Sequence, residues 1–197
     1  FYRDYGSAKI GIQLGHAGRK GSTVAPWEGG GLIEGDGAWQ TECASAVPYL
    51  PGWPEPRAMD ADALARVRSA FAEAARRADR AGFDLVEVHA AHGYLLHQFL
   101  SPITNRRTDG YGGSLENRMR YPLEVFAAVR AAFPAEKPVI LRLSATDWIE
   151  DAWDLDQSVI FSRKLKEMGC DMIHVSSGGL DQRQKITVGP GYQVAFS

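Results

Sequence analysis

Four short apolar runs, separated by segments with helical periodicity, constrain the fold of this chain more than any other feature of its sequence. Turn-forming residues bound each of the runs, which cover residues 9–14, 85–89, 139–144 and 172–176. Runs of this kind are typical of strands buried on both faces, as in parallel sheets. Helical spacing of apolar residues fills the segments between them, at residues 61–81, 114–133 and 154–168. The alternation predicts an α/β fold built from successive βαβ units.

The helical segments carry signals for where they begin and which side they bury. Asp60 or Asp62 is predicted to cap the first helix, and Ser114 to open the second. The third segment places Ile160 and Phe161 in its apolar pattern, which predicts that both contact the core.

Such a sheet can close in two ways, as an open doubly wound sheet or as a (β/α)8 barrel. A dinucleotide-binding open sheet should carry G-x-G-x-x-G after its first strand, and this motif is absent from the sequence. Instead, polar residues stand where the strands end, namely Gln13, His89, Arg142 and residues 176–179. A barrel builds its site in this way, at the C-terminal rim. We therefore predict a (β/α)8 TIM barrel, of which four units would make roughly half, since a whole barrel takes ~250 residues.

The two ends of the chain and one internal stretch depart from this pattern. Residues 1–5 are predicted to be the tail of a helix, and residues 191–197 a loop running into another helix, as expected of a fragment. Residues 21–59 are rich in Gly, Pro and Trp and are too long for an ordinary connection. This rim loop is either a lid over the site or an insertion packed by its own side chains.

Composition excludes several classes of protein. Lys+Arg total 22 against Asp+Glu 24, so nothing draws the chain to nucleic acid. No apolar run approaches the ~20 residues that span a membrane, and the N-terminal residues do not follow the order of a signal peptide. Cys43 and Cys170 lie far apart and are predicted to be free thiols. These features predict a cytoplasmic protein, with a homo-oligomer possible.

The densest group of chemically active residues is His89, His92 and Tyr94. His89 ends a predicted strand, and the other two follow within one turn. Imidazole N–H groups there could hold a carbonyl oxygen and stabilise negative charge on it. A neighbouring phenol could act as a general acid.

Three other readings of the histidines remain open at this point. His89 and His92, with His97 as a third ligand, could bind the metal of a hydrolase or aldolase on a TIM barrel. Against this, zinc needs three or four ligands and a second shell, and only Glu87 lies nearby in sequence. Otherwise the histidines only satisfy backbone groups, or form an exposed patch.

Two further residues are predicted to contact a heterocycle. Gln13 offers both a donor and an acceptor, which suits a ring edge with alternating C=O and N–H groups. Gly11 and Gly15 beside it would let a flat ring approach the backbone. Arg142 interrupts an apolar strand, and a buried guanidinium needs an anionic or strongly polar partner. That partner is either a reduced flavin ring or a carboxylate inside the barrel.

The motifs around these residues resemble the Old Yellow Enzyme family over nearly the whole chain. The resemblance rests on GIQLGHAGRK around Gln13, on HAAHGYLLHQFLSPITNRRTDGYGGSLENR from His89, and on LRLSATDW from Leu141. HAGRK and a histidine at position 92 are similar to its bacterial xenobiotic-reductase branch, whereas other branches often carry Asn at this position.

The resemblance implies FMN at the mouth of the barrel, reduced by NADPH or NADH, and hydride transfer to the activated C=C bond of an enone or nitro compound. Gln13 and Arg142 would contact the flavin, His89 and His92 would hold the substrate's activating oxygen, and Tyr94 would donate the proton. Residues 105–114 would pin the long loop to the next helix.

The resemblance also places residues 1–197 as the central part, strands 3 to 6, of a single FMN-binding domain. The family's strands 1, 2, 7 and 8, including its grip on the FMN phosphate, have no counterpart in this chain. The segment alone is therefore expected to be inactive, and the contrasting hypothesis is a non-catalytic half-barrel.

Overall fold

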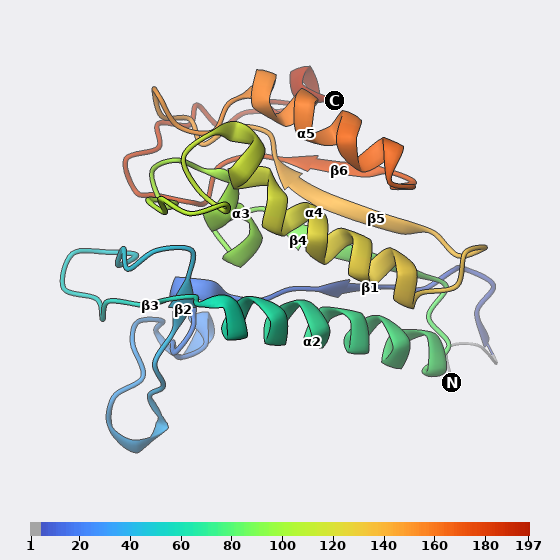
Figure 1. Cartoon of the computed structure of the whole chain (residues 1–197), viewed down its shortest axis with the longest axis horizontal. Helices are drawn as coiled ribbons and strands as arrows, with labels where there is room; N and C mark the ends of the chain where they lie inside the picture. The colour runs from blue at the N-terminus through green and yellow to red at the C-terminus, as the bar shows by residue number, and fades with distance from the viewer. Residues whose placement is uncertain (1–4) are drawn as a thin grey trace.

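A parallel four-stranded sheet forms the centre of the computed structural model, which describes residues 5–197 (Figure 1). The strands stand in the order β1-β4-β5-β6, and their bounds are Gly11–Leu14, Leu85–Ala90, Val139–Ser144 and Ile173–Ser176. Each strand coincides with one predicted apolar run, although β1 and β6 begin slightly later than predicted. The predicted parallel α/β arrangement is therefore confirmed.

Three long helices lie along one face of this sheet (Figure 1). They are α2 (Ala61–Arg80), α4 (Leu115–Ala132) and α5 (Leu155–Glu167), and a short helix, α3 (Leu95–Leu100), follows β4. Asp60, and not Asp62, caps α2, because its side chain accepts a hydrogen bond from the Ala63 N–H at 2.8 Å. Ser114 caps α4 in the same way, as predicted.

The two faces of the sheet differ in character. Val88 and Leu141 are fully buried on the helix-side face, where they join the apolar core beneath α2 and α4. Because successive side chains of a strand point to opposite faces, their neighbours Glu87, His89 and Arg142 lie on the other face, here called the inner face. The inner face carries the polar residues that the sequence placed at the strand ends.

The inner face is concave. Glu87 on β4 accepts a hydrogen bond from Gln13 on β1 and also contacts His174 on β6, with Nδ1···Oε2 at 2.8 Å. Strand β5 lies between β4 and β6, so a side chain can bridge them only if the sheet curves towards this face. Such curvature is what a barrel requires.

One predicted core residue is corrected. Ile160 is 41% exposed, whereas Phe161 beside it is fully buried against the sheet. Helix α5 therefore turns Ile160 to its outer flank. A Cβ on Gly11 would meet the Leu85 side chain at 2.5 Å, so this glycine makes room for a cross-strand neighbour, and its role beside a flat ring stays a prediction.

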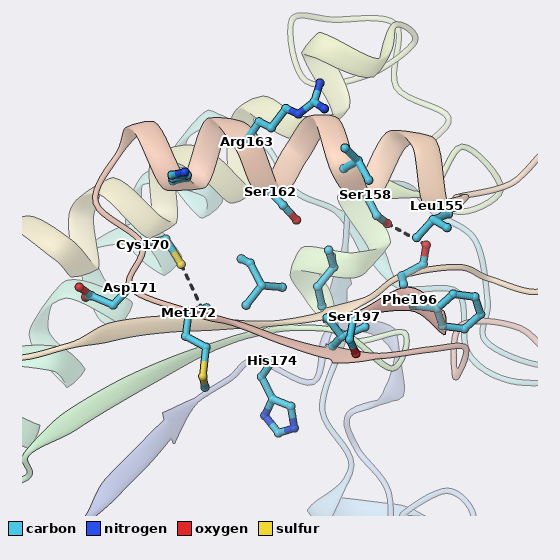
Figure 2. A pocket seen from close by; sticks show the side chains of 16 residues that line it. Leu155, Ser158, Ser162, Arg163, Cys170, Asp171, Met172, His174, Phe196 and Ser197 are labelled. Atoms are coloured by element: carbon cyan, nitrogen blue, oxygen red, sulfur yellow. Dashed lines mark hydrogen bonds between the residues drawn. The ribbon is translucent and has the colours of Figure 1, made fainter. Parts of the chain in front are cut away.

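An apolar groove of about 780 Å³ runs between α5 and β6 on the helix side of the sheet (Figure 2). Leu155, Val159 and Met172 line it and are partly exposed. Figure 2 shows His174 pointing away from the groove, across the strand. The groove is therefore separate from the inner face.

The stretch 21–59 projects beyond the C-terminal ends of the strands (Figure 1), and part of it packs against the rest of the protein. Trp27 is 85% exposed, whereas residues 41–45 are buried. Arg107 donates hydrogen bonds to the carbonyl oxygens of Ala44 and Met59, which confirms the predicted pinning of this loop. Its short elements are η2 (Pro26–Glu28), η3 (Gly35–Gly37), β2 (Glu42–Cys43) and β3 (Arg57–Ala58), after η1 (Gly18–Lys20).

The remaining predictions concern the ends, the thiols and membranes. Residues 1–4 lie outside the described residues, and the C-terminal residues form a loop with the short helix η4 (Val194–Phe196). Cys43 and Cys170 are both free thiols, as predicted. Among residues 5–197, no helix combines the length and the apolar character that crossing a membrane needs.

Candidate functional site

The rings of His89, His92 and Tyr94 converge at the C-terminal end of β4. The His89 ring lies between the other two, with its centroid 5.2 Å from that of His92 and 5.0 Å from that of Tyr94. His89 is the penultimate residue of β4, and Tyr94 is the N-cap residue of α3. The structure thus brings together the three residues that sequence analysis grouped.

Both imidazoles of this cluster are neutral near pH 7. Burial and, to a smaller extent, the nearby Arg142 cation together lower the pKa of His89 to about 4. Burial and the same cation also lower the pKa of His92 to about 4. A neutral imidazole carries one N–H, so each ring can donate one hydrogen bond and accept another. The buried Nδ1 atom of His89 has no hydrogen-bond partner among residues 5–197.

His92 is fixed by contacts from two neighbouring strands. Its Nε2 atom lies 2.6 Å from the Ser176 hydroxyl at the end of β6. Its backbone N–H donates to the hydroxyl of Ser144, the last residue of β5, at 2.9 Å. Sequence analysis missed Ser144 in this role, although the residue lies within the motif LRLSATDW.

Gln13 lies on the inner face of β1, directly opposite Glu87 in the strand register. Its Nε2 atom donates to Glu87 Oε1 at 2.5 Å, and the other Glu87 oxygen contacts His174. Because the carboxylate occupies the amide nitrogen, the amide oxygen is the atom left to accept a hydrogen bond from a ligand. No pattern in the sequence indicated that Glu87 would orient this side chain.

Arg142 is half-buried on β5, in register with His89 on one side and His174 on the other. No carboxylate among the described residues forms an ion pair with it, and its buried Nε atom has no hydrogen-bond partner there. The alternative of a carboxylate partner therefore finds no support among residues 5–197. A half-buried cation with an unsatisfied donor calls for a polar or anionic ligand.

His97 faces away from this cluster. Its side chain is fully buried, Nδ1 accepts the Gly93 N–H at 2.9 Å, and Nε2 lies 2.8 Å from Asp147 Oδ1. Nδ1 thus accepts a backbone N–H and Nε2 lies against a buried carboxylate, so His97 does not offer a nitrogen as a third metal ligand beside His89 and His92. No group of three or more metal-binding side chains occurs among residues 5–197. The geometry removes the basis of the metal-hydrolase alternative.

Lys20 is a site residue that sequence analysis quoted only within its motif. Its Nζ atom donates to the backbone oxygens of His92 and Gly179 and lies 5.5 Å from the centre of the Tyr94 ring. Burial lowers the pKa of Lys20 to about 8, so it still carries its charge at neutral pH. The lysine ties the start of the long loop to the histidine cluster.

Comparison with known proteins shows which family the chain resembles. Residues 3–190 match the family described as NADH:flavin oxidoreductase / NADH oxidase. The chain is 43% identical over 190 residues to an NADPH dehydrogenase of Bacillus velezensis, covering 96% of this chain and 51% of that protein. The chain thus spans about half the length of the curated relatives it matches.

Solved structures give the same result for the fold. A morphinone reductase structure superposes with a TM-score of 0.70 at 32% identity, covering 99% of this chain and 54% of that one. An Old Yellow Enzyme homologue from Zymomonas mobilis also gives a TM-score of 0.70, at 28% identity, over 88% of this chain and 49% of that one. These neighbours are TIM barrels, so the predicted barrel class is confirmed.

Proposed function

Because the chain belongs to the NADH:flavin oxidoreductase / NADH oxidase family, within which the Old Yellow Enzymes are its structural relatives, we propose that the whole protein is an FMN-dependent ene-reductase. It would take hydride from NADPH or NADH and reduce the activated C=C bond of α,β-unsaturated carbonyl or nitro compounds. The observation that carries this proposal is the convergence of two neutral imidazoles and one phenol beside an unsatisfied arginine.

The residues of the inner face fit a flavin. Gln13 is oriented by Glu87 so that its amide oxygen can accept from a ring N–H. Arg142 presents a cation without an ion-pair partner among the described residues, which suits the electron-rich pyrimidine side of the ring. Gln13 and Arg142 would therefore hold the isoalloxazine of FMN, as sequence analysis predicted.

His89 and His92 would bind the oxygen that activates the alkene. FMN, when bound, supplies the hydride for the β-carbon of the substrate. Neutral imidazoles donate hydrogen bonds to that oxygen without adding a full charge to the site. Their low pKa keeps them in this form throughout the neutral range. As negative charge develops on the oxygen, the two N–H donors stabilise it.

Tyr94 would supply the proton. Its ring lies 5.0 Å from the ring of His89, so a substrate oxygen held by the histidines places the adjacent carbons near the phenol. The histidines themselves face the oxygen and are poorly placed to protonate carbon. The phenol is a weak acid of a strength suited to protonating an enolate-like carbon.

The test is to purify the whole protein that carries this chain and measure its flavin absorbance and its two half-reactions by anaerobic stopped flow. The proposal expects stoichiometric FMN, reduction by NAD(P)H, and reoxidation by cyclohexenone. A colourless protein, or a flavin that is reduced but not reoxidised by enones or nitroalkenes, would contradict it. A non-catalytic half-barrel would retain no FMN.

A further inference from the structure

The backbone of His92 and Gly93 is held by four side chains that come from three parts of the chain. Two carbonyl oxygens and two N–H groups are involved, so every polar backbone group of this pair has a partner. The four hydrogen bonds are His92 N–H to Ser144 Oγ (2.9 Å), Lys20 Nζ to His92 O (2.8 Å), Gly93 N–H to His97 Nδ1 (2.9 Å) and Gln98 Nε2 to Gly93 O (2.7 Å).

This backbone needs such support because its conformation is unfavourable. His92 has φ of 57°, in the left-handed region that side chains other than glycine rarely adopt. Strain of this kind persists only where the surrounding structure enforces it. Gly93 has φ of 71°, and a Cβ there would lie 2.4 Å from the Gly179 carbonyl oxygen. The backbone conformation between His92 and Tyr94 is therefore held by side chains from other parts of the structure.

His97 accepts the Gly93 N–H only when its Nδ1 atom carries no proton. An imidazole nitrogen that accepts a backbone N–H carries no proton, so the proton of neutral His97 is on Nε2. Nε2 lies 2.8 Å from Asp147 Oδ1, in a close but bent contact. Both atoms are buried, and neither has a well-aligned hydrogen-bond partner among the described residues. Their contact with each other is therefore what offsets the burial of these two polar atoms.

Asp147 is itself anchored by its second oxygen. Oδ2 accepts the Ser101 hydroxyl at 2.6 Å and the Trp153 backbone N–H at 3.1 Å. The carboxylate is thus fixed to the loop after β5 and to the end of α3. It favours the His97 tautomer with a proton on Nε2, because the other tautomer would point a lone pair at the carboxylate and an N–H at the Gly93 N–H.

We propose that His97 and Asp147 are positioning residues that set the geometry of His92 and Tyr94 for alkene reduction. Gly93 lies between these two residues, so its N–H position fixes the direction in which both side chains leave the backbone. Neither His97 nor Asp147 would contact substrate or flavin. This inference rests on the proposed function for its kinetic consequence, but its structural content, the tautomer of His97, can be tested separately.

The kinetic test compares His97→Gln with His97→Asn in the whole flavin-loaded protein. Asn places its amide oxygen near the position of Nδ1 and can still accept the Gly93 N–H. Gln reaches towards Asp147 and leaves that N–H unpaired. We expect His97→Gln to slow reoxidation by cyclohexenone about 10- to 100-fold, as a misplacement of about 1 Å can, and His97→Asn to restore most of the rate. Reduction by NAD(P)H should change much less in both.

Equal reoxidation rates in the two variants and the parent would overturn the proposal. If His97→Gln does not fold, Asp147→Asn serves the same purpose, because it removes the charge that fixes the tautomer while it keeps the volume. A parental protein that fails to reduce enones would disprove the proposed function alone. Independently of activity, ¹⁵N NMR of labelled histidines, assigned with His97→Asn, should show a proton on Nε2 of His97. A proton on Nδ1 would overturn the inference.

Discussion

The helix-side face and the inner face of the same four strands differ in how their buried atoms are satisfied. On the helix-side face, Val88 and Leu141 are fully buried among apolar neighbours. On the inner face, the adjacent residues His89 and Arg142 carry buried nitrogen atoms that have no hydrogen-bond partner among residues 5–197. The helix-side face is fully packed by the chain's own residues. The inner face presents polar nitrogen atoms that the described residues do not hydrogen-bond.

This difference indicates that a ligand binds to the inner face. Unsatisfied buried donors cost free energy, so a fold retains them where something else satisfies them. The same contrast occurs within the loop after β4. The backbone groups of Gly93 are both hydrogen-bonded, whereas the buried Nδ1 atom of His89 is not. Substitutions on the helix-side face should therefore affect stability, and substitutions on the inner face should affect flavin and substrate.

The largest expected effect comes from comparing two tyrosines, one on each side of the sheet. Tyr94→Phe removes the proposed acid and leaves the ring, and it should slow reoxidation by cyclohexenone about 100- to 10,000-fold. Nitroalkenes, whose reduced products can take a proton from water, should still accept hydride. The measurement is stopped flow of both half-reactions.

Tyr121→Phe is the matched control. The Tyr121 hydroxyl donates to the Leu64 carbonyl oxygen in the buried core, so its loss should cost about 0.5–1.5 kcal/mol of stability without a kinetic effect. Reoxidation of Tyr94→Phe at the parental rate would identify Tyr94 as only a wall of the site.

The second prediction concerns neighbours on β5 that point to opposite faces. Leu141→Ala should lower the free energy of unfolding by about 2–5 kcal/mol, because it opens a cavity in the core. The flavin reduction potential should stay at its parental value. Arg142→Ala should weaken FMN retention and lower that potential, because a cation favours the anionic reduced flavin. Denaturant titration and spectroelectrochemistry separate the two effects. An Arg142→Ala protein that unfolds easily but keeps its potential would contradict the comparison.

The third prediction uses the left-handed backbone at position 92. Asn tolerates this conformation and keeps one amide donor, whereas Ala keeps neither advantage. His92→Ala and His89→Ala should each slow hydride transfer to the alkene by roughly 100-fold or more and weaken binding of phenols, which mimic a bound enolate. His92→Asn should retain more of both. Unchanged phenol affinity in both alanine variants would rule out the proposed role.

The smallest expected effect is on the pH dependence of stability. Both cluster histidines have a folded-state pKa of about 4, below the ordinary value of 6.5, so the unfolded chain binds protons first as the pH falls. Their contribution to stability is complete above pH 6.5 and is lost as the pH falls towards 4. A His89→Gln, His92→Asn double variant should therefore lose less stability than the parent between pH 7 and 5. Equal slopes in urea titrations would contradict this.

The order of strands and helices along the chain, and the grouping of the three candidate site residues, could be predicted from the sequence alone. Apolar runs and helical spacing depend on local residue order, so the four strands and the caps Asp60 and Ser114 were readable from it. His89, His92 and Tyr94 lie within six residues of one another, and the end of one strand brings them together. Ile160 was misplaced because helical spacing alone does not tell how far the buried stripe extends.

The hydrogen-bond and ion-pair partners of these residues follow only from the tertiary structure. Glu87 reaches Gln13 and His174 because the sheet curves, and curvature is a property of several strands together. His97 and Asp147 are 50 residues apart in sequence and meet only when the loop after β5 packs against α3. A local pattern reports what a side chain can do. Hydrogen bonds and burial between distant segments decide which of its atoms are already engaged, and so turned His97 from a possible metal ligand into a support for Gly93.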